Sequence, residues 1–140
     1  MTVRLTDADA IEPGEYRRLR AAVGWAEPDV TDAVLAEALR STWNVTARTD
    51  GALVGMARVL DDGALYASVW DMIVDPAHQR AGIGRAIFER VLLRTGGRTL
   101  VGLVATAAGE PLYRAAGFAE QSRGSTALFR RGSMSDSTAP

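Results

Sequence analysis

The sequence predicts a single α/β domain in which helices flank a mixed, mostly antiparallel sheet. The chain has 140 residues, a length that fits one hydrophobic core better than two. Apolar residues at helical spacing alternate along the chain with apolar runs typical of strands. Their order is β-α-α-β-β-β-α-β-α-β-β, which places about four helices around the sheet. No internal repeat is visible in the sequence.

The first forty residues predict one strand and two helices. Residues 3–6 form a short candidate strand, which the polar residues 7–9 end. A helix then stops at Gly24, and its apolar residues at helical spacing are Tyr16, Leu19 and Val23. A second helix begins with Thr31 as a plausible N-cap, and its apolar face consists of Leu35, Ala38 and Leu39.

Three consecutive strands joined by tight turns are expected next. Asp50-Gly51 and Asp62-Gly63 are sequences that favour hairpin turns. Pro76 ends the third strand because proline has no N–H and a fixed φ. The three strands are predicted at residues 43–48, 53–59 and 65–74.

The last third predicts a helix over residues 84–94 and a nearly continuous apolar strand over 100–105, of the buried kind. Pro111 suits the first turn of a further helix. Gly117 suits its C′ position, with Phe118 packing back. The last predicted strand covers residues 125–130. We assign the domain to residues 1–131 and expect 132–140, which are small and polar, to form a frayed tail.

The composition excludes several classes of protein. A formal net charge of −1 argues against general nucleic-acid binding. All sixteen basic residues are arginine, and the chain has no cysteine, which removes disulfides, thiolate metal sites and a thiol nucleophile. We expect no metal. The sequence has no signal-peptide pattern and no apolar run of membrane-spanning length, so we expect a cytoplasmic protein without a membrane partner.

The most informative segment is the loop Gln79-Arg80-Ala81-Gly82-Ile83-Gly84, which lies between an apolar strand and an amphipathic helix. Its glycines bring backbone N–H groups to the positive end of that helix, which is a favourable site for a phosphate group. Arg80 and Arg85 add positive charge. A Walker A loop needs a lysine and a dinucleotide fingerprint needs a third glycine, and both are missing. The alternative is a tight turn without a ligand.

This loop resembles the acetyl-CoA loop, Gln/Arg-x-x-Gly-x-Gly/Ala, of the GCN5-related N-acetyltransferases (GNAT). The resemblance covers roughly residues 3–130 and is strongest to the bacterial and plant-organelle branch that includes serotonin-N-acetyltransferase-like enzymes. Besides the loop, the segments that carry it are Val23-Gly24-Trp25, Gly55-Met56-Ala57-Arg58-Val59, residues 70–76 and residues 112–118.

The resemblance implies an enzyme that transfers the acetyl group of acetyl-CoA directly to the primary amine of a small molecule. Residues 79–85 would hold the pyrophosphate of acetyl-CoA. Residues 72–74, namely Met72, Ile73 and Val74, would pair with its pantetheine arm and polarise the thioester carbonyl through a backbone N–H. The identity of the amine stays open among arylalkylamines, polyamines, amino acids, antibiotics and protein termini. A homodimer stays open as well.

Tyr113 is the candidate acid that protonates the departing thiolate. It stands four residues before Gly117-Phe118, where the family places its tyrosine, and a phenol is protonated at neutral pH. The alternative is a tyrosine of the core. Many relatives carry asparagine seven residues before this tyrosine, whereas this chain has Thr106, so one contact to the cofactor differs.

The general base is less well defined. Asp71 is a charged residue inside an apolar strand and could accept the amine's proton, anchor a cationic substrate, or be satisfied by arginine or backbone groups. Other branches place their base at the positions of Ser68 or Trp70, and neither is a good base. Histidine is a residue type that can act as a base near neutral pH, but His78 is expected to be exposed in the loop.

Two tryptophans could shape an acceptor pocket. Trp25 follows Gly24 in a segment that lies over the acceptor side in relatives and could stack on an amine-bearing ring. Trp43 begins a strand, which favours core packing. The competing functions are an acyl-CoA-binding sensor without catalysis and a protein N-acetyltransferase. A nucleotide-binding regulator is disfavoured by the missing lysine and glycine.

Overall fold

The computed structural model describes residues 2–120 and 124–132 and divides into two compact units, residues 1–104 and 105–140. The first unit contains a five-stranded sheet in the order β1-β2-β3-β4-β5. Strands β1 to β4 are antiparallel neighbours, and β5 pairs parallel to β4. The expected mixed, mostly antiparallel α/β fold is therefore confirmed. The elements are β1 (Arg4–Thr6), α1 (Pro13–Ala22), α2 (Asp32–Arg40), β2 (Trp43–Thr49), β3 (Ala52–Asp61), β4 (Tyr66–Val74), α3 (Ile83–Thr95), β5 (Leu100–Leu103) and, in the second unit, α4 (Glu110–Ala115).

Local signals in the sequence explain where these elements begin and end. The Thr31 side chain accepts a hydrogen bond from the Val34 N–H and caps α2, as expected. Asp50 and Gly51 both adopt positive φ between β2 and β3, the conformation of a two-residue type I′ hairpin turn. In the second unit, Gly117 has a φ of 95° after α4, and the Phe118 N–H donates to the Tyr113 carbonyl.

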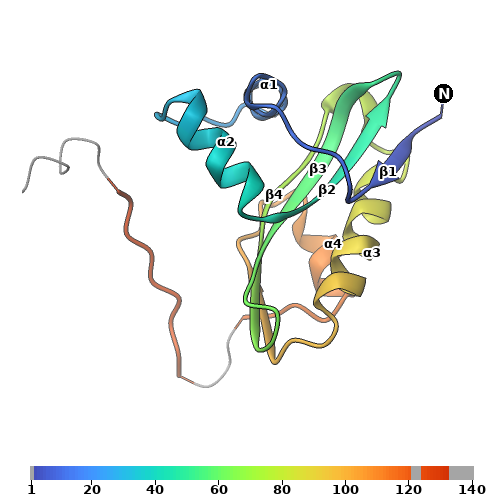
Figure 1. The fold of residues 1–140 in the computed structure, drawn as a ribbon. Helices are drawn as coiled ribbons and strands as arrows, with labels where there is room; N and C mark the ends of the chain where they lie inside the picture. The colour runs from blue at the N-terminus through green and yellow to red at the C-terminus, as the bar shows by residue number, and fades with distance from the viewer. Residues whose placement is uncertain (1, 121–123, 133–140) are drawn as a thin grey trace, which may run out of the picture. The chain divides into compact units, whose positions relative to one another are not determined.

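Helices cover the two faces of the sheet differently. Figure 1 shows α1 and α2 on one side of the strands and α3 on the other. An added Cβ on Gly55 of β3 would lie only 2.9 Å from Ile87 of α3, so glycine permits the close approach of this helix. On the opposite face, side chains from α1, α2, β3, β4 and the segment before α1 form one core cluster, whose buried members are Ile11, Tyr16, Leu19, Leu35, Leu39, Leu53, Met56 and Ile73.

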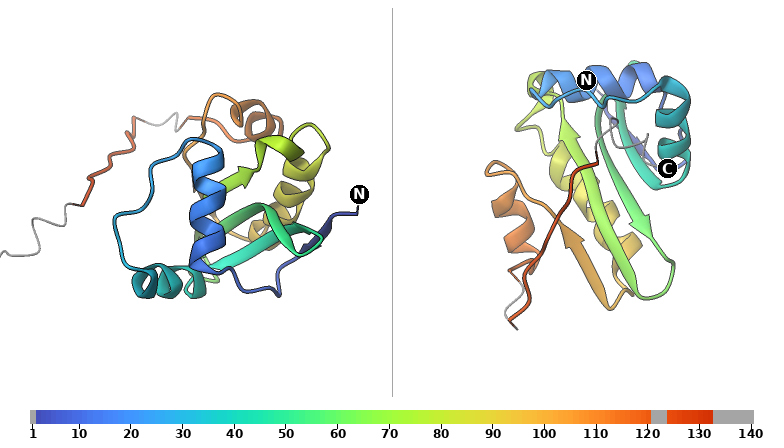
Figure 2. Two further views of the ribbon diagram at one scale, coloured as in Figure 1. Left: turned by 90° about the horizontal axis from the view of Figure 1, so that it is seen from above. Right: turned by 90° about the vertical axis from the view of Figure 1, so that its left-hand side faces the viewer.

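The face under α1 and α2 is only partly covered. In Figure 2, right, these helices lie at the upper end of the sheet, and the β3–β4 hairpin extends below them. Near the turn of this hairpin, Leu60, Tyr66 and Trp70 expose between 41% and 56% of their surface. The sheet therefore offers an apolar, open surface beside the helical cover.

Two expectations for the last third are corrected. The strand predicted as buried over 100–105 is shorter, and its residues alternate between exposed and half-buried, because β5 is an edge strand with a ladder on one side only. The strand predicted at 125–130 does not form within the described residues 124–132. Leu128 and Phe129 there are 86% and 71% exposed, so they gain none of the burial that stabilises a strand. The predicted tail falls largely on residues 133–140, which lie outside the described residues.

Candidate active site

A β-bulge in β4 shapes the centre of the first unit. Met56 pairs with Ile73 and Arg58 pairs with Trp70, so Ala57 alone faces two residues of β4, Asp71 and Met72. Asp71 has a φ of 51°, a left-handed conformation that aspartate tolerates better than most residues. A bulge leaves its extra residue outside the regular ladder and bends the strand. The segment predicted to face the thioester thus lies at an interruption of the sheet.

The carboxylate of Asp71 is held by three donors. Its Oδ2 accepts from the Tyr16 hydroxyl at 2.6 Å and from Nη1 of Arg58 at 2.9 Å. Its Oδ1 accepts from Nη1 of Arg20 at 2.9 Å. The Asp71 side chain is only 11% exposed. Burial, strengthened by the hydrogen bond to Asp71, raises the pKa of Tyr16, which therefore stays a donor. One of the roles considered for Asp71 was a carboxylate satisfied by arginine, and in the structure Arg20 and Arg58 are such partners.

Asp71, the two arginines and Tyr16 make up what we call the Asp71 cluster. Arg58 also donates from Nε to the Thr42 hydroxyl at 3.2 Å and from Nη2 to the Ala38 carbonyl at 2.9 Å. Arg20 lies over the Tyr16 ring at 5.6 Å and donates to the Ala26 carbonyl at 2.9 Å. The cluster joins α1, β3 and β4 and fixes the guanidinium groups by several contacts each.

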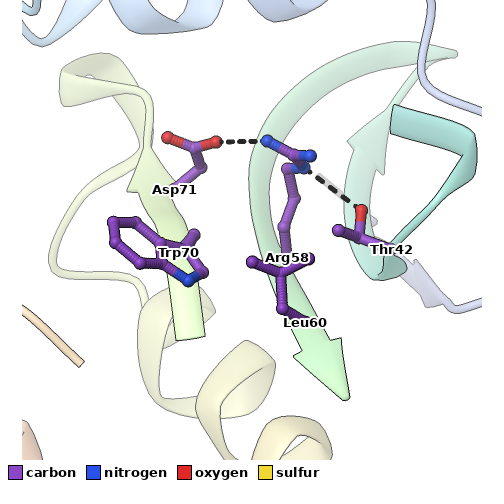
Figure 3. A pocket seen from close by; sticks show the side chains of 5 residues that line it. All are labelled: Thr42, Arg58, Leu60, Trp70 and Asp71. Atoms are coloured by element: carbon purple, nitrogen blue, oxygen red, sulfur yellow. Dashed lines mark hydrogen bonds and ion pairs between the residues drawn. The ribbon is translucent and has the colours of Figure 1, made fainter. Parts of the chain in front are cut away.

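A pocket of about 300 Å³ opens beside this cluster. Figure 3 shows the Arg58 side chain between Asp71 and Thr42, with Trp70 and Leu60 nearer the open end of the sheet. Trp70 donates from its indole N–H to the Ser68 hydroxyl at 2.7 Å, which holds the ring in place. The pocket thus combines an apolar wall with a charged floor. Its lining residues are Thr42, Arg58, Leu60, Trp70 and Asp71.

The loop that follows β4 has a backbone suited to an anion. Arg80 and Gly82 both have positive φ, 66° and 81°, and Gly82 is the N-cap of α3. The first hydrogen bond of helix α3 runs from the Ala86 N–H to the Gly82 carbonyl. The N–H groups of residues 83–85 come before it in the chain and have no acceptor within the helix, so they can bind another acceptor. Arg80 and Arg85 carry the positive charges of this segment. These groups are the ones that bind phosphate at helix N-termini.

The start of α3 rests directly on the end of β4. An added Cβ on Gly84 would lie 3.6 Å from a Val74 methyl and 4.0 Å from the Met72 methyl. The Gln79 side chain donates to the Val74 carbonyl at 3.1 Å and ties the loop to the same strand. The predicted phosphate loop and the predicted pantetheine segment are therefore neighbours in the first unit, as a ligand that contacts both requires.

Tyr113 lies in α4 of the second unit and is buried there, with 8% of its surface exposed. Its ring meets Phe118 edge-on with centroids 6.4 Å apart, and Gly109 leaves room for it, since a Cβ there would lie 3.0 Å from the ring. Burial raises the pKa of Tyr113, so the phenol is protonated at neutral pH. Thr106 stands before this helix, and its carbonyl accepts from the Gly109 and Glu110 N–H groups.

The other aromatic candidates have structural partners. Arg20 lies 5.4 Å from the Trp25 ring, which packs against the α1–α2 core cluster, and Trp25 is not among the residues that line the pocket. Trp43 donates to Asp7 at 3.2 Å and carries Arg94 over its ring at 5.6 Å. His78 is half-buried rather than exposed, because residues 76–78 close into a 3₁₀ turn, and its Nδ1 has no hydrogen-bond partner within the described part of the chain.

Sequence reasoning did not find Arg58, Arg20 and Tyr16 as parts of the site. A signal was available for Arg58, because an arginine in the middle of an apolar strand needs a buried acceptor. That acceptor is Asp71, another charge inside an apolar strand. Two such charges of opposite sign on neighbouring strands predict an ion pair.

A strand with a bulge, followed by a glycine loop at a helix start, is the arrangement that the sequence resemblance implies for an acyl-CoA site. Residues 41–120 match the model of the acetyltransferase (GNAT) domain family. Since this match covers more than half of the chain, the chain belongs to the GNAT acetyltransferase domain family.

Among the described residues, no helix is long and apolar enough to cross a membrane.

Curated relatives agree with this family. Histone acetyltransferase TAP1 of soybean is 36% identical over 80 residues, which make up 55% of this chain and 34% of the relative. Serotonin N-acetyltransferase 2, chloroplastic, of rice is 41% identical over 71 residues, 49% of this chain and 36% of the relative. The matched segment spans about a third of the length of these relatives. The cellular location and the oligomeric state of this chain stay predictions.

Solved structures agree over nearly the whole chain. A GNAT-family acetyltransferase from Streptococcus pneumoniae has a TM-score of 0.74 at 27% identity and covers 94% of this chain and 97% of its own. A protein of unknown function from methicillin-resistant Staphylococcus aureus has a TM-score of 0.83 at 24% identity, with 94% and 100% covered. The second likeness concerns the fold alone.

Proposed function

We propose that this protein is an acetyl-CoA-dependent N-acetyltransferase that acts on a primary amine of a small molecule. The observation that carries the proposal is the contact between the start of α3 and the end of β4. Gly84 lies against Met72 and Val74, so one extended ligand can contact the phosphate loop and the bulged strand together. A pocket of about 300 Å³ beside the bulge has the size of a small-molecule site.

Acetyl-CoA would supply an activated acetyl group: the amine nitrogen forms the new C–N bond, the C–S bond breaks, the amine loses a proton and the thiolate gains one. The residues of the chain divide this work. Backbone N–H groups of residues 82–85 bind the pyrophosphate, with Arg80 and Arg85 adding charge. A backbone N–H at Met72 or Ile73, beside the bulge, polarises the carbonyl. The Tyr113 phenol donates the proton to the thiolate.

Asp71 is a positioning residue in this proposal. Its oxygens already accept three hydrogen bonds, and two of the donors are guanidinium groups whose positive charges the carboxylate partly balances. We propose that it holds Arg20 and Arg58 in place beside the pocket, and that the amine gives up its proton to water. An Asp71 carboxylate that accepts the proton itself is the alternative.

The names of the relatives support an amine acceptor but do not distinguish a small molecule from a protein. The rice relative is named for serotonin, a small amine, and the soybean relative for histone. The volume of the pocket, about 300 Å³, and the buried Asp71 cluster beside it favour a small molecule over a protein segment. The CoA-release assay described below would also reveal a protein acceptor, because it includes peptides.

Ligand-induced stabilisation tests the cofactor. CoA and acetyl-CoA should raise the melting temperature, whereas ATP and NAD should do so weakly, because a ligand that binds only the folded state stabilises it. Gly82→Val should abolish the shift, since its φ of 81° is strained for valine and an added side chain would stand where phosphate approaches. Gly63→Val is the matched control, because Gly63 has the same φ and the same open surroundings in the β3–β4 turn.

Release of free CoA with a panel of primary amines tests the transfer itself. We expect turnover with at least one small amine and none without acceptor beyond slow hydrolysis. If Gly82→Val keeps the full CoA shift, the loop is not the phosphate site. If wild-type protein binds CoA but acetylates neither small amines nor peptides, the chain is an acyl-CoA sensor.

A further inference from the structure

The charges beside the pocket do not balance. Two guanidinium groups, Arg20 and Arg58, share one carboxylate, Asp71, in the salt bridges of 2.9 Å each. Across residues 2–120 and 124–132, no second carboxylate bonds to either arginine. The carbonyls of Ala26 and Ala38 accept from them as neutral dipoles. One positive charge is therefore left without a counter-ion, and the three side chains are only 11% to 19% exposed.

Arg58 carries this charge to the pocket. It is one of the five lining residues, whereas Arg20 is not. An arginine has five N–H donors. Three of those of Arg58 are used by Asp71, Thr42 and Ala38, which leaves two for a ligand. The bonds already made hold the planar group in one orientation, so little side-chain entropy is lost when a further acceptor binds.

The rest of the pocket lining on these two strands is apolar. Leu60 and Trp70 are 49% and 41% exposed, and they stand on the strands that carry Arg58 and Asp71. The Trp70 indole N–H is already bonded to Ser68, so the ring offers its apolar faces. In Figure 3, Trp70 lies next to Asp71 on β4, and Leu60 lies beside Arg58 on β3, further along the strand from the ion pair. A ligand therefore meets an apolar wall and a single net positive charge.

We infer that the acceptor is an amine that also carries an acid group, with the acid paired to Arg58 and its apolar part against Trp70 and Leu60. This inference rests on the proposed function. A carboxylate completes the charge balance of a site that is short of one negative charge, and arginine is well suited to it because its N–H groups match the two oxygens. A diamine or polyamine would bring a second positive charge to a site that already has an excess, because the single negative charge of Asp71 is already shared by two guanidinium groups.

Matched acceptors test this charge preference. We would compare 4-(aminomethyl)benzoic acid with its carboxamide and with p-xylylenediamine, and phenylalanine with phenylalaninamide, correcting each rate for the fraction of free amine. The acids should have a kcat/KM about 10- to 100-fold above their carboxamides, the range of one hydrogen-bonded ion pair. The diamine should be poorer still. The same order should appear in the melting temperature measured with CoA present, a readout that needs no turnover.

Leu60→Asp tests the origin of the preference without touching the buried cluster. It places a carboxylate on the wall of the pocket, so the advantage of the acids should fall by about 10-fold and the diamine should gain. Leu65→Asp is the control, because Leu65 is 52% exposed and does not line the pocket. Arg58→Lys keeps the charge but loses the planar contact, so it should weaken the preference without reversing it.

The outcomes separate the two proposals. Acids that bind and react no better than their carboxamides overturn the inference even when other amines are acetylated. An equal loss of the acids' advantage in Leu60→Asp and Leu65→Asp would also overturn the inference, because the preference would then come from the net charge of the whole protein. Charge discrimination in the melting assay without any acetylation would contradict the proposed function and still support an acid-binding pocket.

Discussion

Replacing Asp71 with asparagine removes the carboxylate from the middle of the Asp71 cluster while keeping the shape of the side chain. The change is well controlled, because Asp71 has a φ of 51° and asparagine tolerates the left-handed region as well as aspartate does. The three hydrogen bonds to the carboxylate, of 2.6 to 2.9 Å, lose their negative acceptor. Two guanidinium groups that are 19% and 13% exposed are then left without a counter-ion.

The expected cost follows from the burial of this pair. Removing one partner of a buried ion pair typically costs 3–5 kcal/mol. Asparagine keeps one acceptor oxygen, and the arginines keep their bonds to the Ala26 and Ala38 carbonyls, so we expect the lower end, about 3 kcal/mol. A chain of 140 residues unfolds with an entropy of roughly 0.3 kcal/mol/K, so the melting temperature should fall by about 10 °C.

Thermal and urea unfolding of Asp71→Asn measure this cost, and Glu37→Gln is the control. Glu37 pairs with Arg40 at 2.6 Å, but both side chains are about two-thirds exposed, so its loss should cost under about 1 kcal/mol. In kinetics, a positioning role predicts a raised KM for the acceptor with kcat largely kept. A variant as stable as wild type with a kcat about 10²-fold lower would refute this reasoning and make Asp71 the general base.

Three further predictions concern the acid, its pH dependence and the packing of α3. Tyr113→Phe should keep CoA binding and lower kcat by roughly 10²-fold or more, measured where chemistry limits the rate, and full turnover would exclude the phenol as the proton donor. Burial raises the pKa of Tyr113, so the phenol loses its proton only at a pH above its ordinary pKa of about 10, and kcat should fall only there. A fall of kcat near neutral pH that disappears in Tyr113→Phe would contradict this prediction. Gly55→Ala should destabilise the fold by about 1–3 kcal/mol in urea unfolding, because its Cβ would lie 2.9 Å from Ile87 and 3.3 Å from the Ile73 carbonyl, and an unchanged stability would mean that α3 adjusts freely.

Features that depend on a few adjacent residues were predictable from the sequence. Thr31 caps α2, Asp50-Gly51 forms the β2–β3 turn, and Gly117 ends α4, since each needs only its own conformational preference. The loop at residues 79–85 was predictable in the same way. Its position between a strand and a helix could be read from apolar spacing.

Features that depend on distant residues were not predictable. The Asp71 cluster joins residues 51 and 55 positions apart in the sequence, and no local pattern shows that Arg20 and Tyr16 of α1 reach the bulge. The exposure of β5 depends on its place at the sheet edge, which an apolar run does not reveal. Leu128 and Phe129 have the pattern of a strand, but a strand needs a partner as well as a pattern.

The central claim is that acetyl-CoA binds along the loop at residues 79–85 and the end of β4. Backbone amide NMR of the ¹⁵N-labelled chain, titrated with acetyl-CoA, measures this residue by residue. The largest shift changes should fall on the amides of residues 79–85 and on Met72 and Ile73, at the same half-saturation point, while the β2–β3 turn at Asp50-Gly51 stays unchanged. Saturable binding that leaves the amides of residues 79–85 unmoved would contradict the account.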